Sequence, residues 1–340
     1  MKFFGLTLSL VLFAGGCVPQ RPVHTSNPPT QKSQESTEIP QLSGYALGQP
    51  ISYENITIYP VESKDKQLLG TEYATLSEAK KNGWVEIVEK PGQEEVAFLR
   101  VRNTGPKSLM LLGGELLLGG KQDRIVAKDT IVPPGKEIDV PVYCVEHGRW
   151  SPTYDKFTYS DTTVPAKVRE RATYGNQQEV WDGVEQYNAK VAAPSGETSV
   201  QSGLFRGEVQ ADISKALPYV RDPLLGNGNA VGMVCLVNGQ ILTLEMFGNH
   251  ELFRSHAPAL LKGFLAEAAT SKGVAQQTHS VDSVAKFVAE AMGGDRRQTA
   301  HRAGASEWSA NTRSTRGVEM RPADNDKGLL HGTYSATQSN

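Results

Sequence analysis

The chain has 340 residues, of which 39% are hydrophobic, so it is long enough and apolar enough to bury a substantial core. Its 35 basic and 37 acidic residues give a formal net charge of −2. This balance excludes the basic footprint of most nucleic-acid-binding proteins, and we expect no nucleic-acid partner.

Residues 1–16 have the features of a bacterial export signal. Lys2 gives a positive start, residues 3–14 are almost entirely apolar, and small residues precede Cys17. The apolar run is shorter than the ~20 residues of a membrane-spanning helix but matches a signal-peptide core. The site resembles a lipobox, although Ala14 stands where Leu is commonest. We predict a lipoprotein that begins at lipidated Cys17; the alternative is an ordinary secretory signal with Cys17 incidental.

Residues 17–43 are rich in Pro, Ser, Thr and Gln. Such a segment buries too little apolar surface to offset its ordering entropy, so we predict a disordered tether. Val18, rather than Asp, follows the anchor, which favours the outer membrane if the host is Gram-negative. The expected location is the cell envelope, with the membrane as partner through the lipid on Cys17.

We expect the folded region to span residues 44–270, with residues 271–340 completing it. In its first half, β-branched or alternating runs separated by Gly and Pro turns predict short strands. They lie at 51–59, 84–88, 96–102, 109–112, 124–126, 130–132 and 138–145, and a short helix is predicted at 75–81. This spacing is typical of an antiparallel β-sandwich or a barrel-like unit.

The pattern changes after residue 150. Helical spacing is found at 165–190 with a break near Gly175, at 249–269 and at 281–292, and Asn238-Gly239 predicts a hairpin between strands 230–236 and 241–247. We interpret residues 217–229 as irregular, residues 295–316 as a polar loop, and residues 325–328 as the turn of a last strand pair. The predicted class is α+β, with a mainly β first half and a second half of helices with a hairpin.

Cys144 and Cys235 both lie in apolar, strand-like runs. An exported protein can form disulfides, but sequence does not show whether two Cα atoms approach. We interpret the pair as two buried free thiols. Because there is no Cys-x-x-Cys or His-x-x-His pattern, we expect no zinc site, and no cofactor is indicated.

Two polar segments, 113–124 and 144–150, stand out among glycines and strand ends, where sites are commonly built. Arg can bind a carboxylate or phosphate through two parallel hydrogen bonds. The segments supply acid or base candidates (Glu115, Glu146, His147), an amide (Gln122), an anion clamp (Arg124, Arg149) and a stacking surface (Trp150).

Each candidate also has a structural interpretation. The glycine pairs fit turns or bulges, Glu115 with Arg124 fits a buried ion pair, and Trp150 fits a core residue. His250 and His256, near a helix start, fit capping or exposure. No Ser or Thr follows Lys121, which excludes a Walker motif, and Gly-x-Ser-x-Gly and HExxH are absent from the sequence.

Segments 114–124, 130–135 and 140–150, and more distantly 230–253, resemble the ADP-ribosylglycohydrolase (ARG) and rhodanese-phosphatase-superfamily-associated protein domain family, a domain family of unknown function. The resemblance covers about residues 44–269 and extends more loosely to the C-terminus. The family's name reflects genomic association with enzymes that handle ADP-ribose and related nucleotides, which does not assign a reaction. It implies that the positions to test are Glu115, Gln122, Arg124, Glu146, Arg149 and Trp150.

Three functions remain open at this stage. The first is a ligand-binding or envelope-interaction module whose partner is a small molecule or an envelope component, with Arg124, Arg149 and Trp150 accessible. The second is a hydrolase or nucleotide-processing enzyme acting on an ADP-ribose-like ligand, with Glu115 and Glu146 in one cleft and the pKa of one raised. The third is a purely structural envelope protein with a buried polar network.

The lipid anchor is directly testable. We expect mass spectrometry of the chain expressed in a bacterium to find a mature start at Cys17 carrying acyl chains such as palmitate. Cys17→Ser should remove the acyl chains, whereas the control Cys144→Ala should keep them. An intact Met1, or a mature start without acyl chains, would contradict the prediction.

Overall fold

The computed structural model of the chain describes residues 36–64, 72–90, 97–148, 156–272, 279–302, 304–323 and 328–337. The predicted export signal, Cys17 and most of the predicted tether lie outside these residues, as do the candidates Arg149 and Trp150. Within the described ranges, no helix has the length and apolar character needed to cross a membrane.

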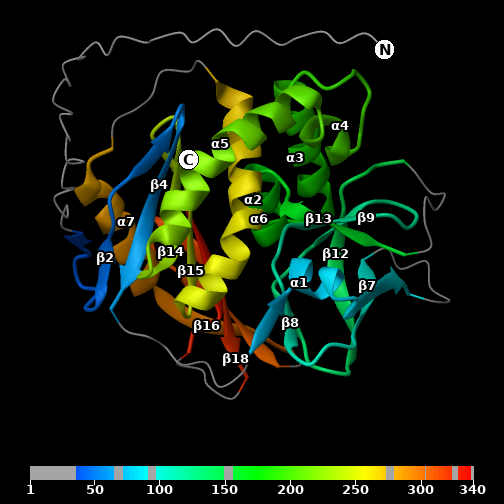
Figure 1. Ribbon diagram of the computed structural model, residues 1–340, viewed down its shortest axis with the longest axis horizontal. Coiled ribbons are helices and arrows are strands. Elements are labelled where there is room, and N and C mark those ends of the chain that lie inside the picture. Colours follow the sequence, from blue (N-terminus) through cyan, green and yellow to red (C-terminus); the bar gives the residue numbers. More distant parts are fainter. Residues whose placement is uncertain are drawn as a thin grey trace, which may run out of the picture. The chain divides into compact units, whose positions relative to one another are not determined.

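A large antiparallel sheet lies on the left and at the bottom of the view in Figure 1. Among the described residues it has ten strands in the order β1-β2-β4-β14-β15-β19-β18-β17-β16, with β3 paired to β4. The strands are β1 (Thr37–Glu38), β2 (Tyr45–Leu47), β3 (Ile51–Tyr53), β4 (Ile56–Ser63), β14 (Ala230–Val237), β15 (Gln240–Phe247), β16 (Asp295–Arg302), β17 (Ala305–Asn311), β18 (Thr315–Pro322) and β19 (His331–Ala336).

Two smaller sheets build the β-rich first half that the sequence predicts. They have the strand orders β13-β9-β10-β12-β7-β6 and β11-β8-β5 and share an apolar core that includes Leu99, Leu117 and Val126. The strands are β5 (Tyr73–Thr75), β6 (Val85–Glu89), β7 (Phe98–Asn103), β8 (Ser108–Leu111), β9 (Glu115–Leu118), β10 (Arg124–Val126), β11 (Thr130–Val132), β12 (Glu137–Cys144) and β13 (Thr158–Thr163). The predicted α+β class is confirmed.

Helices cover both faces of the large sheet. The main core joins one face to α2–α6, while the amphipathic α7 packs on the other face through residues such as Val284 and Val288 (Figure 1). The helices are α1 (Leu76–Lys81), α2 (Ala166–Tyr174), α3 (Gln177–Lys190), α4 (Val200–Leu204), α5 (Gly207–Gly226), α6 (His250–Ala268), the 3₁₀ helix η1 (Ala269–Ser271) and α7 (Val281–Gly293). The predicted break between α2 and α3 and the Asn238-Gly239 hairpin are confirmed.

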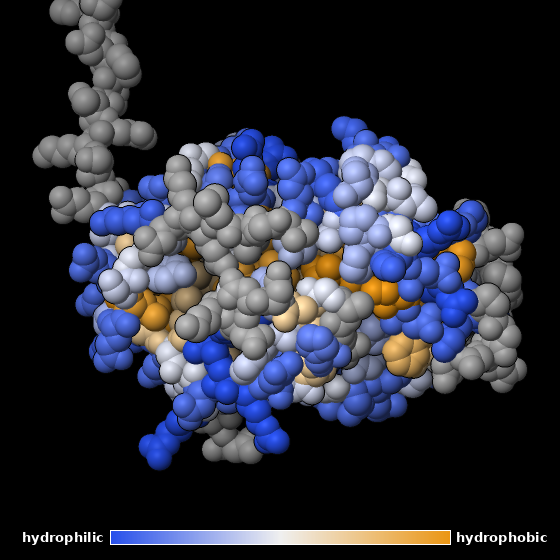
Figure 2. Space-filling view, turned by 90° about the horizontal axis from the view of Figure 1, so that it is seen from below, coloured by the Kyte–Doolittle hydropathy of each residue, from blue (hydrophilic) through white to orange (hydrophobic). Residues whose placement is uncertain are grey.

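Hydrophilic residues surround a central band of apolar residues on the face in Figure 2. Among the described residues, the large apolar side chains that are exposed are Phe205 and Tyr219. The described apolar side chains therefore serve mainly the three cores.

The sequence interpretation of residues 295–316 as a polar loop is wrong. These residues form β16, β17 and the start of β18, an antiparallel extension of the large sheet. Two arginines of the segment have carboxylate partners: Arg296 donates to the fully buried Glu319 of β18 at 2.9 Å, and Arg316 donates to Glu170 of α2 at 2.9 Å. Paired charges can occupy a strand where unpaired charges could not be buried.

Two boundaries also differ from the sequence predictions. Residues 217–226, predicted to be irregular, end α5, which accommodates Pro218 and Pro223. Proline removes a helical hydrogen bond, but the burial of Val220 and Leu224 against the core holds the helix. In the predicted tether, β1 pairs with β2 and Ile39 is buried, so the ordered part begins before residue 44.

Three buried charged side chains and the largely buried Asp129, from distant parts of the chain, form one network. Arg169 on α2 donates to Glu245 on β15 through both terminal nitrogens, at 2.5 and 3.2 Å. The imidazole of His331 on β19 contacts Glu245 through Nε2 (2.9 Å) and Asp129 through Nδ1 (2.6 Å). The network therefore joins α2, the large sheet and the segment between β10 and β11.

The network fixes the charge of its histidine. Burial lowers the pKa of His331, but Asp129 and Glu245 outweigh burial and raise this pKa to about 9. Burial alone would raise the pKa values of Asp129 and Glu245, but their charged partners in the network lower both values below the ordinary ones. Because the folded pKa of His331 exceeds the unfolded value, its stabilising contribution is complete below pH ~6.5 and is lost as the pH rises through 9.

Removal of one partner should destabilise the protein strongly. We expect Glu245→Gln to lower the free energy of unfolding by about 3–5 kcal/mol, because it leaves Arg169 buried without its counter-charge. Urea unfolding measures the change. The matched control is Glu208→Gln, which removes the exposed pair with Arg206 and should change stability by less than about 1 kcal/mol. If the two variants lost equal amounts of unfolding free energy, the network would not be a major source of stability.

Candidate functional site

A pocket of about 460 Å³ lies where the start of β9 meets β13 and α6. Three buried titratable side chains line it: Glu115 of β9, Tyr159 of β13 and His256 of α6. Residues of α1 and the more exposed Asp161 and Lys262 complete its lining. The pocket therefore combines elements from both halves of the domain.

Glu115 owes its position to the glycine turn before it. Gly114 has φ +88°, and a Cβ there would lie 2.7 Å from Cγ of Arg169, so the position requires glycine. Arg169 Nε donates to the Gly113 carbonyl at 2.7 Å, and the Gly113 N–H donates to Asp129 at 2.7 Å. The buried ionic network thus fixes the backbone that carries Glu115.

The carboxyl group of Glu115 is neutral at neutral pH. Burial raises its pKa to about 8, although hydrogen bonds with the Leu112 backbone (3.1 Å) and the Tyr159 side chain act in the opposite direction. A protonated carboxyl can both donate and accept a hydrogen bond. Burial also raises the pKa of Tyr159 well above its usual value, so its hydroxyl stays protonated.

A β-bulge shapes the wall of the pocket. The register between β13 and β9 shifts between Tyr159 and Thr163, and Asp161 within it has φ +58°. Lys262 donates to the Asp161 carbonyl at 2.8 Å and Lys80 donates to the Tyr159 carbonyl at 2.5 Å. Bulges re-aim side chains next to sites, and here two lysines hold the bulge in place.

His256 is buried, which contradicts the prediction of capping or exposure. Asn249 caps α6, and His256 lies further along on the core face of the helix. Burial lowers the pKa of His256 to about 4, while the Leu252 and Met110 backbones oppose the shift. The ring Nδ1 lies 2.9 Å from the Leu252 carbonyl, so it carries the proton. Nε2 is then an acceptor, and it makes no hydrogen bond of good geometry within the described part of the chain.

Arg124 and Gln122 lie away from this pocket, in the interior. Arg124 is fully buried, and its Nη1 donates to Gln122 at 3.3 Å. The expectation of an accessible Arg124 clamp is therefore wrong. The predicted ion pair with Glu115 is also wrong, because β10 sets Arg124 opposite Leu117 and Cys144.

Glu146 does not join Glu115. It accepts a hydrogen bond from the Asp123 N–H at 3.1 Å and is not among the residues that line the Glu115 pocket. The expected convergence of the two acids in one cleft is thus not observed. Exposed His147 packs against Trp181, with ring centroids 4.6 Å apart.

The two cysteines within the described residues are poor candidates for a nucleophile. Cys144 and Cys235 are both buried and free, as predicted. Burial raises the pKa of each thiol, which disfavours the reactive thiolate. Within the described residues, no group of three or more His, Cys, Asp or Glu side chains could hold a metal ion.

The domain model named "ARG and Rhodanese-Phosphatase-superfamily-associated Protein domain" (ARPP-1) matches residues 44–335. The match includes Glu115, Tyr159 and His256, and it extends through the C-terminal strands that the sequence resemblance covered only loosely. Comparison with curated proteins and with solved structures gave no match.

The raised pKa of Glu115 predicts a specific pH dependence. Because the folded state holds this proton up to pH about 8, the contribution of Glu115 to stability is complete below the unfolded pKa of ~4.3 and falls as the pH rises. Relative to Glu115→Gln, the wild type should lose about 1.4 kcal/mol per pH unit between those values. Urea unfolding at pH 5, 7 and 9 tests this, with Glu208→Gln as control. Parallel pH profiles for wild type and Glu115→Gln would show that Glu115 has an ordinary pKa.

Proposed function

The chain belongs to the ARG and Rhodanese-Phosphatase-superfamily-associated Protein domain family, and we propose that it is a ligand-binding module with its binding site in the Glu115 pocket. The observation that carries the proposal is the gathering of three buried titratable groups, Glu115, Tyr159 and His256, in one cavity. Perturbed titratable groups in a pocket are typical of functional sites. The volume of about 460 Å³ lies within the range of small-molecule sites.

The chemistry of the three groups indicates the kind of ligand. At neutral pH all three are uncharged: Glu115 as a carboxylic acid, Tyr159 as a phenol and His256 as a neutral imidazole. They offer donors and acceptors but no counter-charge for an ion. The site therefore favours a neutral polar group at these positions, with charged ligand groups placed nearer Lys81, Asp161 and Lys262.

The second part of the proposal is that the domain is displayed in the cell envelope through a lipid on Cys17. The basic start, apolar core and small residues before Cys17 support it. The ligand would then be a small molecule or an envelope component that reaches the outside of the cytoplasmic membrane.

Hydrolysis of an ADP-ribose-like ligand is the second candidate function. It is favoured by the Glu115 carboxyl, which is protonated at neutral pH and could act as a general acid. The displaced Glu146 and the buried Arg124 weigh against this candidate.

A thermal-shift screen against nucleotides, sugars and peptides tests the binding proposal, because a ligand of the native state must raise its stability. Tyr159→Phe removes one hydroxyl from the pocket and should weaken a hit about fivefold, the effect of one hydrogen bond of ~1 kcal/mol. Tyr143→Phe, whose hydroxyl donates to the Gly175 carbonyl outside the pocket, is the matched control. A hit unaffected by Tyr159→Phe would place the binding site elsewhere.

Glu115→Gln separates the two functions. The amide keeps a donor and an acceptor but cannot deliver a proton. If the domain is a binding module, the affinity of the wild type should fall above pH 8, where Glu115 loses its proton, and Glu115→Gln should bind the ligand without this fall. If it is a hydrolase, Glu115→Gln should bind the substrate but not turn it over.

A further inference from the structure

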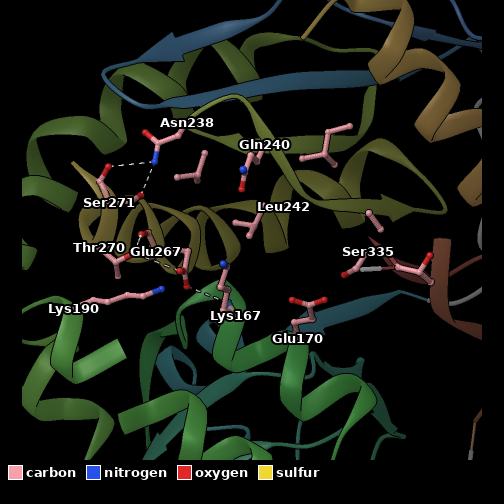
Figure 3. Close-up of a pocket in the computed structure, with 14 residues that line it drawn as sticks. Lys167, Glu170, Lys190, Asn238, Gln240, Leu242, Glu267, Thr270, Ser271 and Ser335 are labelled. Atoms are coloured by element: carbon pink, nitrogen blue, oxygen red, sulfur yellow. Dashed lines mark hydrogen bonds between the residues drawn. The ribbon is translucent and has the colours of Figure 1, made fainter. Parts of the chain in front are cut away.

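We propose that a second cavity of the domain binds a small organic anion that carries hydroxyl groups, such as a carboxylated or phosphorylated sugar. This cavity also measures about 460 Å³. It lies between α2, α3, the end of α6 with η1, the β14–β15 turn and the end of β19 (Figure 3). It shares no lining residue with the Glu115 pocket.

Two lysines provide the positive charge. Lys167 of α2 and Lys190 of α3 extend into the cavity from different helices (Figure 3). Within the described ranges, neither ammonium group forms an ion pair. Other lysines do, such as Lys80 with Asp161 and Lys272 with Asp212. Two cations that converge on one cavity can bind a single anionic group.

The acidic residues of the cavity already have partners. Glu170 accepts a hydrogen bond from Arg316 at 2.9 Å. The buried Glu267 accepts the backbone N–H of Lys167 at 3.1 Å, so it lies at the N-terminal end of α2, where a carboxylate is favoured by the helix dipole. With Glu170 paired to Arg316, the two lysine ammonium groups share the cavity with one unpaired carboxylate, that of Glu267, so the lining keeps a net positive charge among the described residues.

The rest of the lining suits hydroxyl groups. It includes the amides and hydroxyls of Asn238, Gln240, Thr270, Ser271, Ser335 and Thr337. Asn238 is held in the hairpin turn, where its Nδ2 donates to Ser271 Oγ at 2.8 Å. Its Oδ1 is buried and has no hydrogen-bond partner in the described part of the chain. The hydroxyl and amide groups of the lining can form hydrogen bonds with the hydroxyl groups of a ligand.

The chemistry excludes simpler occupants. A neutral sugar would leave both lysines unused. Inorganic phosphate would contact the lysines but would fill little of the cavity and could not reach the hydroxyl and amide lining. A ligand that carries both an anionic group and hydroxyl groups contacts the two lysines as well as the amide and hydroxyl lining. The anionic group can be a carboxylate or a phosphate.

Titration calorimetry of the full chain with D-glucuronate, glucose 6-phosphate, D-glucose and inorganic phosphate tests the proposal. We expect at least one of the two anionic sugars to bind about tenfold or more tightly than D-glucose and phosphate. Lys167→Gln and Lys190→Gln should each weaken that binding about tenfold, the effect of one charged hydrogen bond. Lys286→Gln, which changes an exposed lysine on α7, should leave it unchanged.

Five results would overturn the proposal. Four of them are the absence of binding by both anionic sugars, equal binding of D-glucose, equal binding of phosphate, and binding that survives both lysine substitutions. The fifth is weaker binding in Tyr159→Phe, because the ligand would then occupy the Glu115 pocket. That last result would leave the proposed function of the Glu115 pocket standing.

Discussion

The contact among Asp129, Arg169, Glu245 and His331 is the constraint on which the described structure depends. Each of these charges would be strongly unfavourable in the interior without its partners, so the segments that carry them must assemble together. Asp129 and His331 are 202 residues apart in the chain, and the network closes that distance inside the core. Because two of its members also bind the Gly113 peptide group, the same network sets the geometry of Glu115. A scaffold fixed in this way is pre-organised for binding.

The distribution of charge divides the two cavities by chemistry. Several interior cations and carboxylates are paired, as Glu319 with Arg296 and Arg321 also illustrates. Among the described residues, no salt bridge joins a cation to the Glu115 carboxyl group, and burial raises its pKa so that it keeps its proton. In the proposed binding mode, the pocket around Glu115 recognises ligands through hydrogen bonds rather than charge. The cavity between α2 and α3 has the opposite character, because within the described ranges its two lysines form no ion pair while Glu170 is paired with Arg316.

Local patterns in the sequence predicted the elements that depend on local signals. The Asn238-Gly239 turn and the break at Gly175 are examples, and the glycine motif drew attention to Glu115, which lines a pocket. Predictions failed where long-range pairing decides burial: Arg124, expected at the surface as most arginines are, is fully buried. Tyr159 and His256 were missed as site residues because the β13 bulge and the buried face of α6 become visible only in three dimensions. Nothing local in the sequence links Arg169 to Glu245.

The charge of His331 tests the central claim most directly. Nuclear magnetic resonance of the imidazole nitrogens, assigned with a His331→Asn variant, can follow its protonation state from pH 5 to 10. The account predicts that both ring nitrogens of His331 carry protons at pH 7 and that the ring titrates near pH 9. A His331 ring that is neutral at pH 7, or that titrates near its ordinary value, would contradict a network in which two carboxylates hold a buried cation.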